Sequence, residues 1–138
     1  MKTTKIIFWI TTIAIFLFEG VMPISSLIFT PEYTYIGTRP LGYPDYFAVA
    51  LIFFKLAGVL AILLPQVPAR LKEWAYAGLT FNLVFAVISH VVVDGNIAYI
   101  LMPIVVMAVL AGSYFSWHKI HAARNRQKED GLYVRSMA

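Results

Sequence analysis

Several ionisable or strongly polar side chains fall inside long apolar stretches of this sequence. Glu19 and Lys55 each lie near the middle of such a stretch, and a third stretch carries Asn82 and His90, with Asp94 four residues further on. Ionisable groups at membrane depth are costly and usually face the interior of a protein. Such groups join helices, transfer protons or bind a ligand. These residues are therefore the candidates for a functional site.

Glu19 and Lys55 are predicted to lie at the same depth. Glu19 is thirteen residues from the start of its apolar run, and Lys55 is nine residues from the start of a run in the opposite direction. At about 1.5 Å per residue, both fall just outward of the middle of a ~30 Å core. We expect an ion pair. Two interpretations stay open: the pair fixes helix register, or it sets the field and moves protons beside a ligand.

The third apolar stretch carries polar residues along one side of a predicted helix. Four residues recur at intervals of four: Gly78, Asn82, Ala86 and His90. Ser89 flanks this stripe, and Asp94 ends it. These side chains either join helices by hydrogen bonds or bind a ligand, with His90 donating to a carbonyl oxygen. His90 and Asp94 alone are too few for a metal site, and none is predicted. The ligand-binding candidates are Glu19, Lys55, Asn82, Ser89, His90 and Asp94, and no catalytic residue is assigned.

The elements that position these residues are predicted to be membrane-spanning helices. The 138 residues are 60% hydrophobic and 13% charged, against about 45–50% and about 25% in soluble domains. Four apolar runs have the length of a spanning helix: 6–29, 46–64, 74–93 and 97–116. We therefore expect one all-α domain, an integral membrane four-helix antiparallel bundle, with loops at 30–45 and 94–96 and a basic tail at 117–138.

Two properties of the sequence narrow the function classes. The chain has no cysteine, which excludes thiolate nucleophiles, thiolate metal sites and disulfides. The first residues also have the outline of a signal peptide, a basic start followed by an apolar run. However, Glu19 follows that run directly and no Ala-x-Ala site is present, so we expect the first helix to be retained.

Basic residues are distributed asymmetrically between the predicted loops. With the N-terminus inside, nine basic residues are cytoplasmic: Lys2, Lys5, Arg70, Lys72, Lys119, Arg124, Arg126, Lys128 and Arg135. Only Arg39 then lies outside. The positive-inside rule thus places both termini in the cytoplasm of a cell membrane, expected to be a bacterial inner membrane. The tail at 118–128 is expected to meet membrane lipids, and no nucleic-acid partner is predicted.

Four short segments resemble the DoxX-like family of small four-helix membrane proteins. They are Gly42-Tyr43-Pro44, Lys55-Leu56-Ala57-Gly58, Lys72-Glu73-Trp74-Ala75-Tyr76-Ala77-Gly78 and Ser89-His90. The resemblance spans essentially the whole chain and also fits Glu19. It implies the fold and the membrane location more than an activity. Members of that family include a small subunit of a thiosulfate:quinone oxidoreductase, other proteins linked to membrane oxidoreductase complexes, and an assembly chaperone of acetylcholine receptors.

Two function classes remain open. In the first, the chain is a non-catalytic subunit or assembly factor that meets a protein partner or a second copy of itself. In the second, the polar cluster lines a pocket for a quinone, a lipid or another small apolar molecule; quinone is the one cofactor candidate. A tightly filled bundle favours the first class, and a pocket open to the membrane favours the second. From the sequence we favour the first, with any enzymatic role limited to an accessory subunit of a quinone-linked oxidoreductase. A transporter is a third class, with little support from four helices that lack half-helices.

Overall fold

Four helical segments, each long and apolar enough to cross a membrane, dominate the computed structural model, which describes residues 1–137. The first segment consists of α1 (Lys2–Ile15), the π-helical turn η1 (Phe16–Val21) and α2 (Met22–Phe29). The others are α4 (Asp45–Leu63), α5 (Ala69–Val93) and α6 (Ile97–Met137). Within the described residues there is no strand, so the predicted all-α membrane bundle is confirmed.

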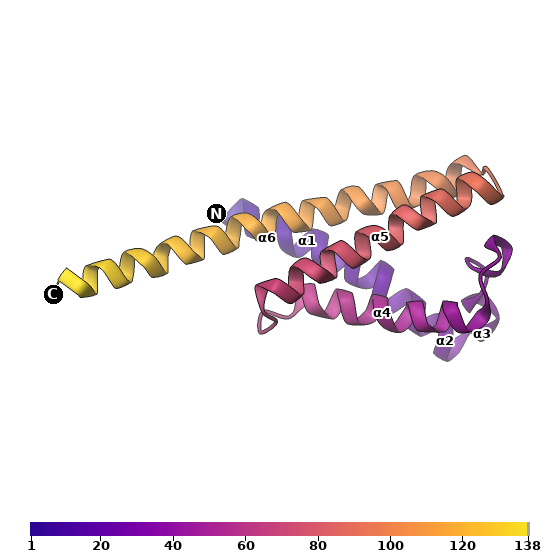
Figure 1. Cartoon of the computed structure of the whole chain (residues 1–138), viewed down its shortest axis with the longest axis horizontal. Helices are drawn as coiled ribbons and strands as arrows, with labels where there is room; N and C mark the ends of the chain where they lie inside the picture. Colours follow the sequence, from indigo (N-terminus) through magenta and orange to yellow (C-terminus); the bar gives the residue numbers. More distant parts are fainter. Residues whose placement is uncertain (138) are drawn as a thin grey trace.

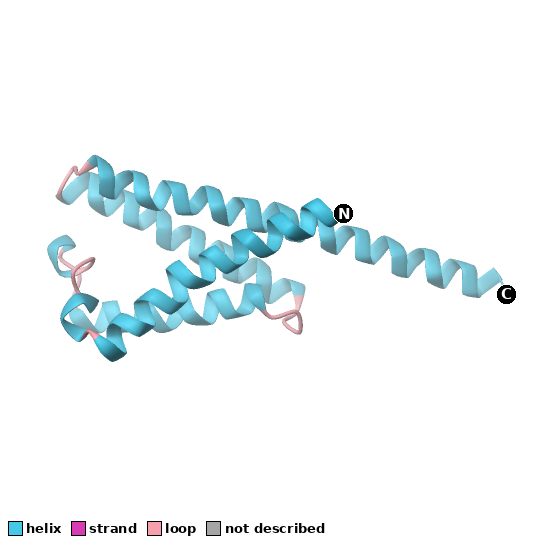
Figure 2. Cartoon of the chain, turned by 180° about the vertical axis from the view of Figure 1, so that it is seen from behind, coloured by secondary structure: helices cyan, strands magenta, loops and turns pink. Residues whose placement is uncertain are grey.

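The four segments pack as a closed ring that alternates in direction (Figure 1). α5 lies between α4 and α6, joined to them by short turns. The first segment crosses α6 and α4 obliquely (Figure 2). Its α1 part packs mainly on α6, whereas its η1 part packs on α4. Because the four segments alternate in direction, both chain ends lie at the same end of the bundle (Figure 1). Apolar side chains make up most of the buried core, with Ile15, Val59 and Ile62 almost fully buried, and a few polar residues, among them Thr12 and Glu19, are buried with them.

The first segment widens into a π-helical turn at Glu19. The N–H of Met22 donates to the carbonyl of Leu17, five residues earlier. Pro23 explains the position of this turn, because proline has no N–H for the carbonyl four residues before it and its ring would collide with that carbonyl, which belongs to Glu19. π-helical turns of this kind are frequent at functional sites. This π-helical turn was not predicted from the sequence.

The predicted tight turn between α5 and α6 is present. Gly95 adopts a φ of +60°, a left-handed conformation that suits glycine. The Asp94 carboxylate accepts a hydrogen bond from the N–H of Asn96, and the Asn96 side chain accepts one from the N–H of Ala98. The predicted loop at 30–45 contains two short helical turns, α3 (Pro31–Thr34) and η2 (Arg39–Leu41).

The end of α4 is capped by a lysine from the next helix. Pro65 and Pro68 keep the chain from continuing as a helix, which leaves the last carbonyls of α4 without helical partners. The Nζ atom of Lys72 donates to three of these carbonyls, at 2.9, 3.1 and 2.7 Å: Ala61, Ile62 and Leu64. Lys72 is buried in this position. The lysine therefore joins α4 to α5 as well as contributing to the basic end of the chain.

α6 is much longer than the predicted span at 97–116. It continues without a break to Met137 and projects beyond the rest of the bundle (Figure 1). The predicted basic tail is thus helical over its described part, and its last residue, Ala138, lies outside the described residues. No proline follows Ser116, and the helix continues through Asp130-Gly131 although that dipeptide favours a turn. The predicted division into one domain and a tail stays a prediction.

Candidate functional site

Glu19, Lys55 and Asn82 come together in the middle of the bundle. The Lys55 Nζ atom lies 2.9 Å from the Glu19 carboxylate, and the Asn82 amide donates to the same oxygen at 3.4 Å. The predicted ion pair is therefore present. The two side chains differ in exposure: that of Glu19 is 3% exposed and that of Lys55 is 21% exposed. The carboxylate is enclosed by protein, while the lysine reaches it from a more open side.

The local structure of the first segment brings Glu19 close to α4. Glu19 lies within η1, next to Gly20, and both are buried. A Cβ atom added at Gly20 would lie only 2.7 Å from the Cγ2 atom of Val59 on α4. Only glycine therefore permits this approach of the two backbones, which brings Glu19 within reach of Lys55.

A groove between α4 and α5 begins at this cluster. It has a volume of about 830 Å³ and carries Lys55 and Asn82 at one end. Its remaining walls are apolar and extend to the α4–α5 turn, where Leu64, Val67 and Leu71 line it. Small residues form part of its floor: Ala57, Gly58, Ala61, Ala75 and Gly78. The arrangement can bind an elongated apolar molecule and offer N–H donors to its polar group.

The other three predicted site residues form a separate group near the C-terminal end of α5, which is expected from the sequence to face outward; it is called the outer group. His90 Nδ1 lies 2.9 Å from the Asp94 carboxylate, and Ser89 shares a hydrogen bond of 2.7 Å with the Tyr43 hydroxyl. The N–H of Asn96 and the His90 imidazole lower the pKa of Asp94. His90 is eight residues from Asn82, or about 12 Å along the helix. The six candidates thus divide into a central and an outer group, and a ligand would have to be long to meet both.

A buried hydroxyl network links three helices below the central group. The hydroxyl of Ser113 on α6 lies 2.6 Å from that of Thr12 and 2.7 Å from that of Tyr76. Thr12 and Ser113 are fully buried. This network was not predicted, because Thr12 and Ser113 are 101 positions apart in the sequence.

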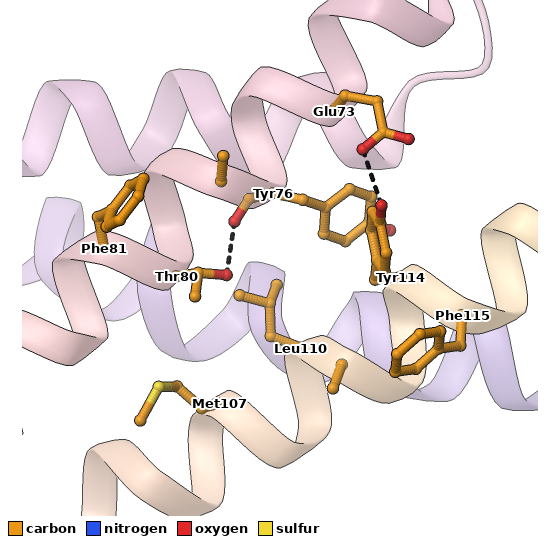
Figure 3. Close-up of a pocket in the computed structure, with 10 residues that line it drawn as sticks. Glu73, Tyr76, Thr80, Phe81, Met107, Leu110, Tyr114 and Phe115 are labelled. Carbon is orange, nitrogen blue, oxygen red and sulfur yellow. Dashed lines mark hydrogen bonds between the residues drawn. The ribbon is translucent and has the colours of Figure 1, made fainter.

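A second polar cluster between α5 and α6 was also missed. Glu73 accepts a hydrogen bond of 3.0 Å from the Tyr114 hydroxyl and pairs with His118 through its other oxygen. Figure 3 shows Glu73 and Tyr114 at one side of a pocket whose remaining wall is largely apolar. His118, which belongs to the predicted basic tail, is 44% exposed and pairs with Glu73. Within residues 1–137, no group of three or more His, Asp or Glu side chains is placed to hold a metal ion.

Comparison with known proteins identifies a family for this architecture. The model of the DoxX-like family matches residues 7–113. This range includes α4, α5 and most of the first segment, the first part of α6, and both groups of candidate residues. No curated protein and no solved structure matched the chain.

Proposed function

The chain belongs to the DoxX-like family of membrane proteins, and from this premise we propose that it binds a neutral, carbonyl-bearing apolar molecule in the groove between α4 and α5. The proposal covers quinones and other long-chain carbonyl compounds. The observation that carries it is the groove of about 830 Å³ that ends at Lys55 and Asn82. A tightly filled bundle would have favoured a purely structural role, and the groove favours ligand binding instead.

The charges of the central group favour a neutral ligand. Glu19 and Lys55 neutralise one another at 2.9 Å, so the groove offers no net charge to an anionic head group. Lysine has three N–H donors and the Asn82 amide has two. Only one of each is used by the bond to Glu19. The remaining donors suit a carbonyl oxygen, and the apolar walls suit an isoprenoid or alkyl chain.

The groove can be tested by filling it. A Cβ atom added at Gly78 would meet nothing within 4 Å, so Gly78→Leu should occupy the groove without straining the fold. Ala50→Leu is the matched control, because Ala50 is exposed on α4 and does not line the groove. The purified protein in detergent is titrated with ubiquinone-2, and bound ligand is counted by native mass spectrometry. We expect Gly78→Leu to lower retention by about tenfold, the effect of about 1.4 kcal/mol.

Two further probes define the polar end of the site. The double variant Glu19→Leu with Lys55→Met should also lose ubiquinone-2, because it removes the donors of Lys55. Oleic acid, an anionic ligand of similar length, should bind more weakly than ubiquinone-2. Equal retention of ubiquinone-2 by the wild type, Gly78→Leu and the double variant would contradict the proposal.

The projecting part of α6 supports a second candidate function, that of a non-catalytic subunit or assembly factor. Leu132, Val134 and Met137 are each 65–70% exposed at its end. Isolated helices are marginally stable in water, so a partner that packs on this helix would stabilise it. The mass of the complex extracted in mild detergent, with and without residues 124–137, tests this role. A mass reduced only by the weight of the deleted residues would argue against it.

We also propose that both termini are cytoplasmic, in a bacterial inner membrane. Both ends lie at one end of the bundle (Figure 1), and nine basic residues belong to the segments at that end. Cysteines introduced at Thr38 and Ser136 should differ when intact cells are treated with an impermeant reagent: Thr38 should be labelled and Ser136 should not. The reverse pattern would invert the topology.

A further inference from the structure

A pocket between α5 and α6 lies on the opposite side of α5 from the groove described above. It has a volume of about 380 Å³ and includes Glu73, Tyr114 and an apolar wall (Figure 3). Glu73 and Asn82 are nine residues apart, or two and a half helical turns, so they face opposite sides of α5. The pocket is therefore independent of the proposed site at Lys55 and Asn82.

Glu73 is the one ionisable carboxylate that lines this pocket, and it keeps free acceptor positions. The Thr80 hydroxyl already donates to the carbonyl of Tyr76, and the Tyr76 hydroxyl is bonded to Ser113. Glu73 receives bonds from Tyr114 and His118, one on each oxygen. A carboxylate has about four lone-pair positions, so about two remain. Its side chain is 39% exposed, which leaves these positions accessible.

A carboxylate held in this way suits a ligand that donates hydrogen bonds and carries positive charge. The Tyr114 ring, whose hydroxyl is bonded to Glu73, adds an attraction for cations at this end of the pocket, while Phe81 lines its far side (Figure 3). Phe81 and Phe115 are more than half exposed, whereas Leu110, which lines the same pocket, is buried. The pocket thus combines an anionic end with an apolar wall.

We propose that this pocket binds an aminophospholipid, with the primary ammonium of an ethanolamine head group on Glu73. One acyl chain lies along the apolar wall formed by Phe81, Met107 and Leu110. Arg70 is exposed on α5 one turn before Glu73, on the same side of the helix, and takes the phosphate. A phospholipid whose head group is anionic and has no ammonium group is repelled by the negative charge of Glu73.

The selectivity for the head group tests this proposal. The delipidated full chain in detergent is titrated with dioleoyl phosphatidylethanolamine, phosphatidylglycerol or phosphatidylcholine, and retained lipid is counted by native mass spectrometry. We expect the ethanolamine lipid to be retained about fivefold better than the other two, the scale of a partly exposed ion pair. Glu73→Gln should abolish this preference. Glu129→Gln, an exposed change on the projecting part of α6, should keep it.

A second pair of variants tests the pocket itself. Ala77→Leu fills the pocket and should reduce retention of the ethanolamine lipid, whereas Ala50→Leu should not. Gly78→Leu, which fills the other groove, should also leave this preference unchanged, so failure of one proposal is distinguishable from failure of the other. Three results would each overturn the inference: equal retention of the three lipids, a preference that survives Glu73→Gln, or retention unaffected by Ala77→Leu.

Discussion

Replacing either Glu19 or Lys55 with an apolar residue should lower the free energy of unfolding. The size of the loss should depend on which charge remains in the bundle. Lys55→Met leaves the Glu19 carboxylate 3% exposed, with only the long 3.4 Å bond from Asn82. Glu19→Leu leaves Lys55, whose side chain is 21% exposed and flexible enough to turn its ammonium toward a more polar level. The carboxylate has no such escape, because η1 encloses it.

The magnitudes follow from these environments. Removing one partner of a buried ion pair typically costs about 3–5 kcal/mol, and we assign that range to Lys55→Met. For Glu19→Leu we expect no more than about 2.5–3.5 kcal/mol, the lenient scale for a lone charge in a membrane helix. The double variant removes both charges and keeps apolar volume, so it should lie within about 1 kcal/mol of the wild type. Asn82→Leu should cost only about 0.6 kcal/mol, the average for one interhelical hydrogen bond.

Equilibrium unfolding in mixed micelles measures all four variants on one scale. The coupling between the two charges should reach or exceed about 3 kcal/mol, the upper end for side chains in contact. Additive losses in the double variant would refute the ion pair as an energetic unit. An equal cost for the two single variants would refute the argument from unequal exposure.

Three further predictions concern the close helix contact, the α4 cap and the outer turn. Gly20→Ala should cost about 1–3 kcal/mol because its Cβ would overlap a side chain of α4, while Gly78→Ala, which meets open space, should be neutral or stabilising in the same unfolding assay. Lys72→Met removes three hydrogen bonds from the end of α4 and should cost about 1.5–3 kcal/mol; an equal loss from Arg70→Met, an exposed neighbour, would show that the cap is not the cause. Since the folded pKa of Asp94 is lowered from 3.8, its contribution to stability should be complete above that value and be lost as the pH falls through the lower folded pKa; melts at acid pH should show this step, and Asp94→Asn should remove it.

The fold class and the depth of each polar residue in the membrane could be predicted from the sequence. Both depend on the length of each apolar run and on position along it. Counting residues placed Glu19 and Lys55 at one level, and the structure pairs them. The same counting put Asn82 and His90 on one side of α5, with His90 nearer one end, and the separation is about 12 Å along the helix. A stripe along a helix axis predicts which residues face inward, and it does not predict that they meet one another.

The missed features depend on contacts between segments that are distant in the sequence or on subtle local signals. Pro23 is a signal that the helix is irregular near Glu19. A proline inside a helix, however, predicts a kink as readily as a π-helical turn. Lys72 had an adequate explanation in the positive-inside rule, which concealed its role at the end of α4. The meeting of Thr12 with Ser113 required knowledge of which helices are neighbours, which one sequence does not provide.

The pairing of Glu19 with Lys55 also has a consequence for how the protein is made. Helix one leaves the ribosome first, so Glu19 reaches the insertion machinery before Lys55 has been synthesised. A lone carboxylate in lipid is strongly unfavourable, whereas the paired helices satisfy both charges. We therefore expect helix one to remain beside the translocation channel until α4 arrives, and the two to enter the bilayer together as a hairpin. Insertion of the first segment would then depend on the ion pair. In a chain that lacks Lys55, we expect the first segment to enter the bilayer late or the chain to be degraded.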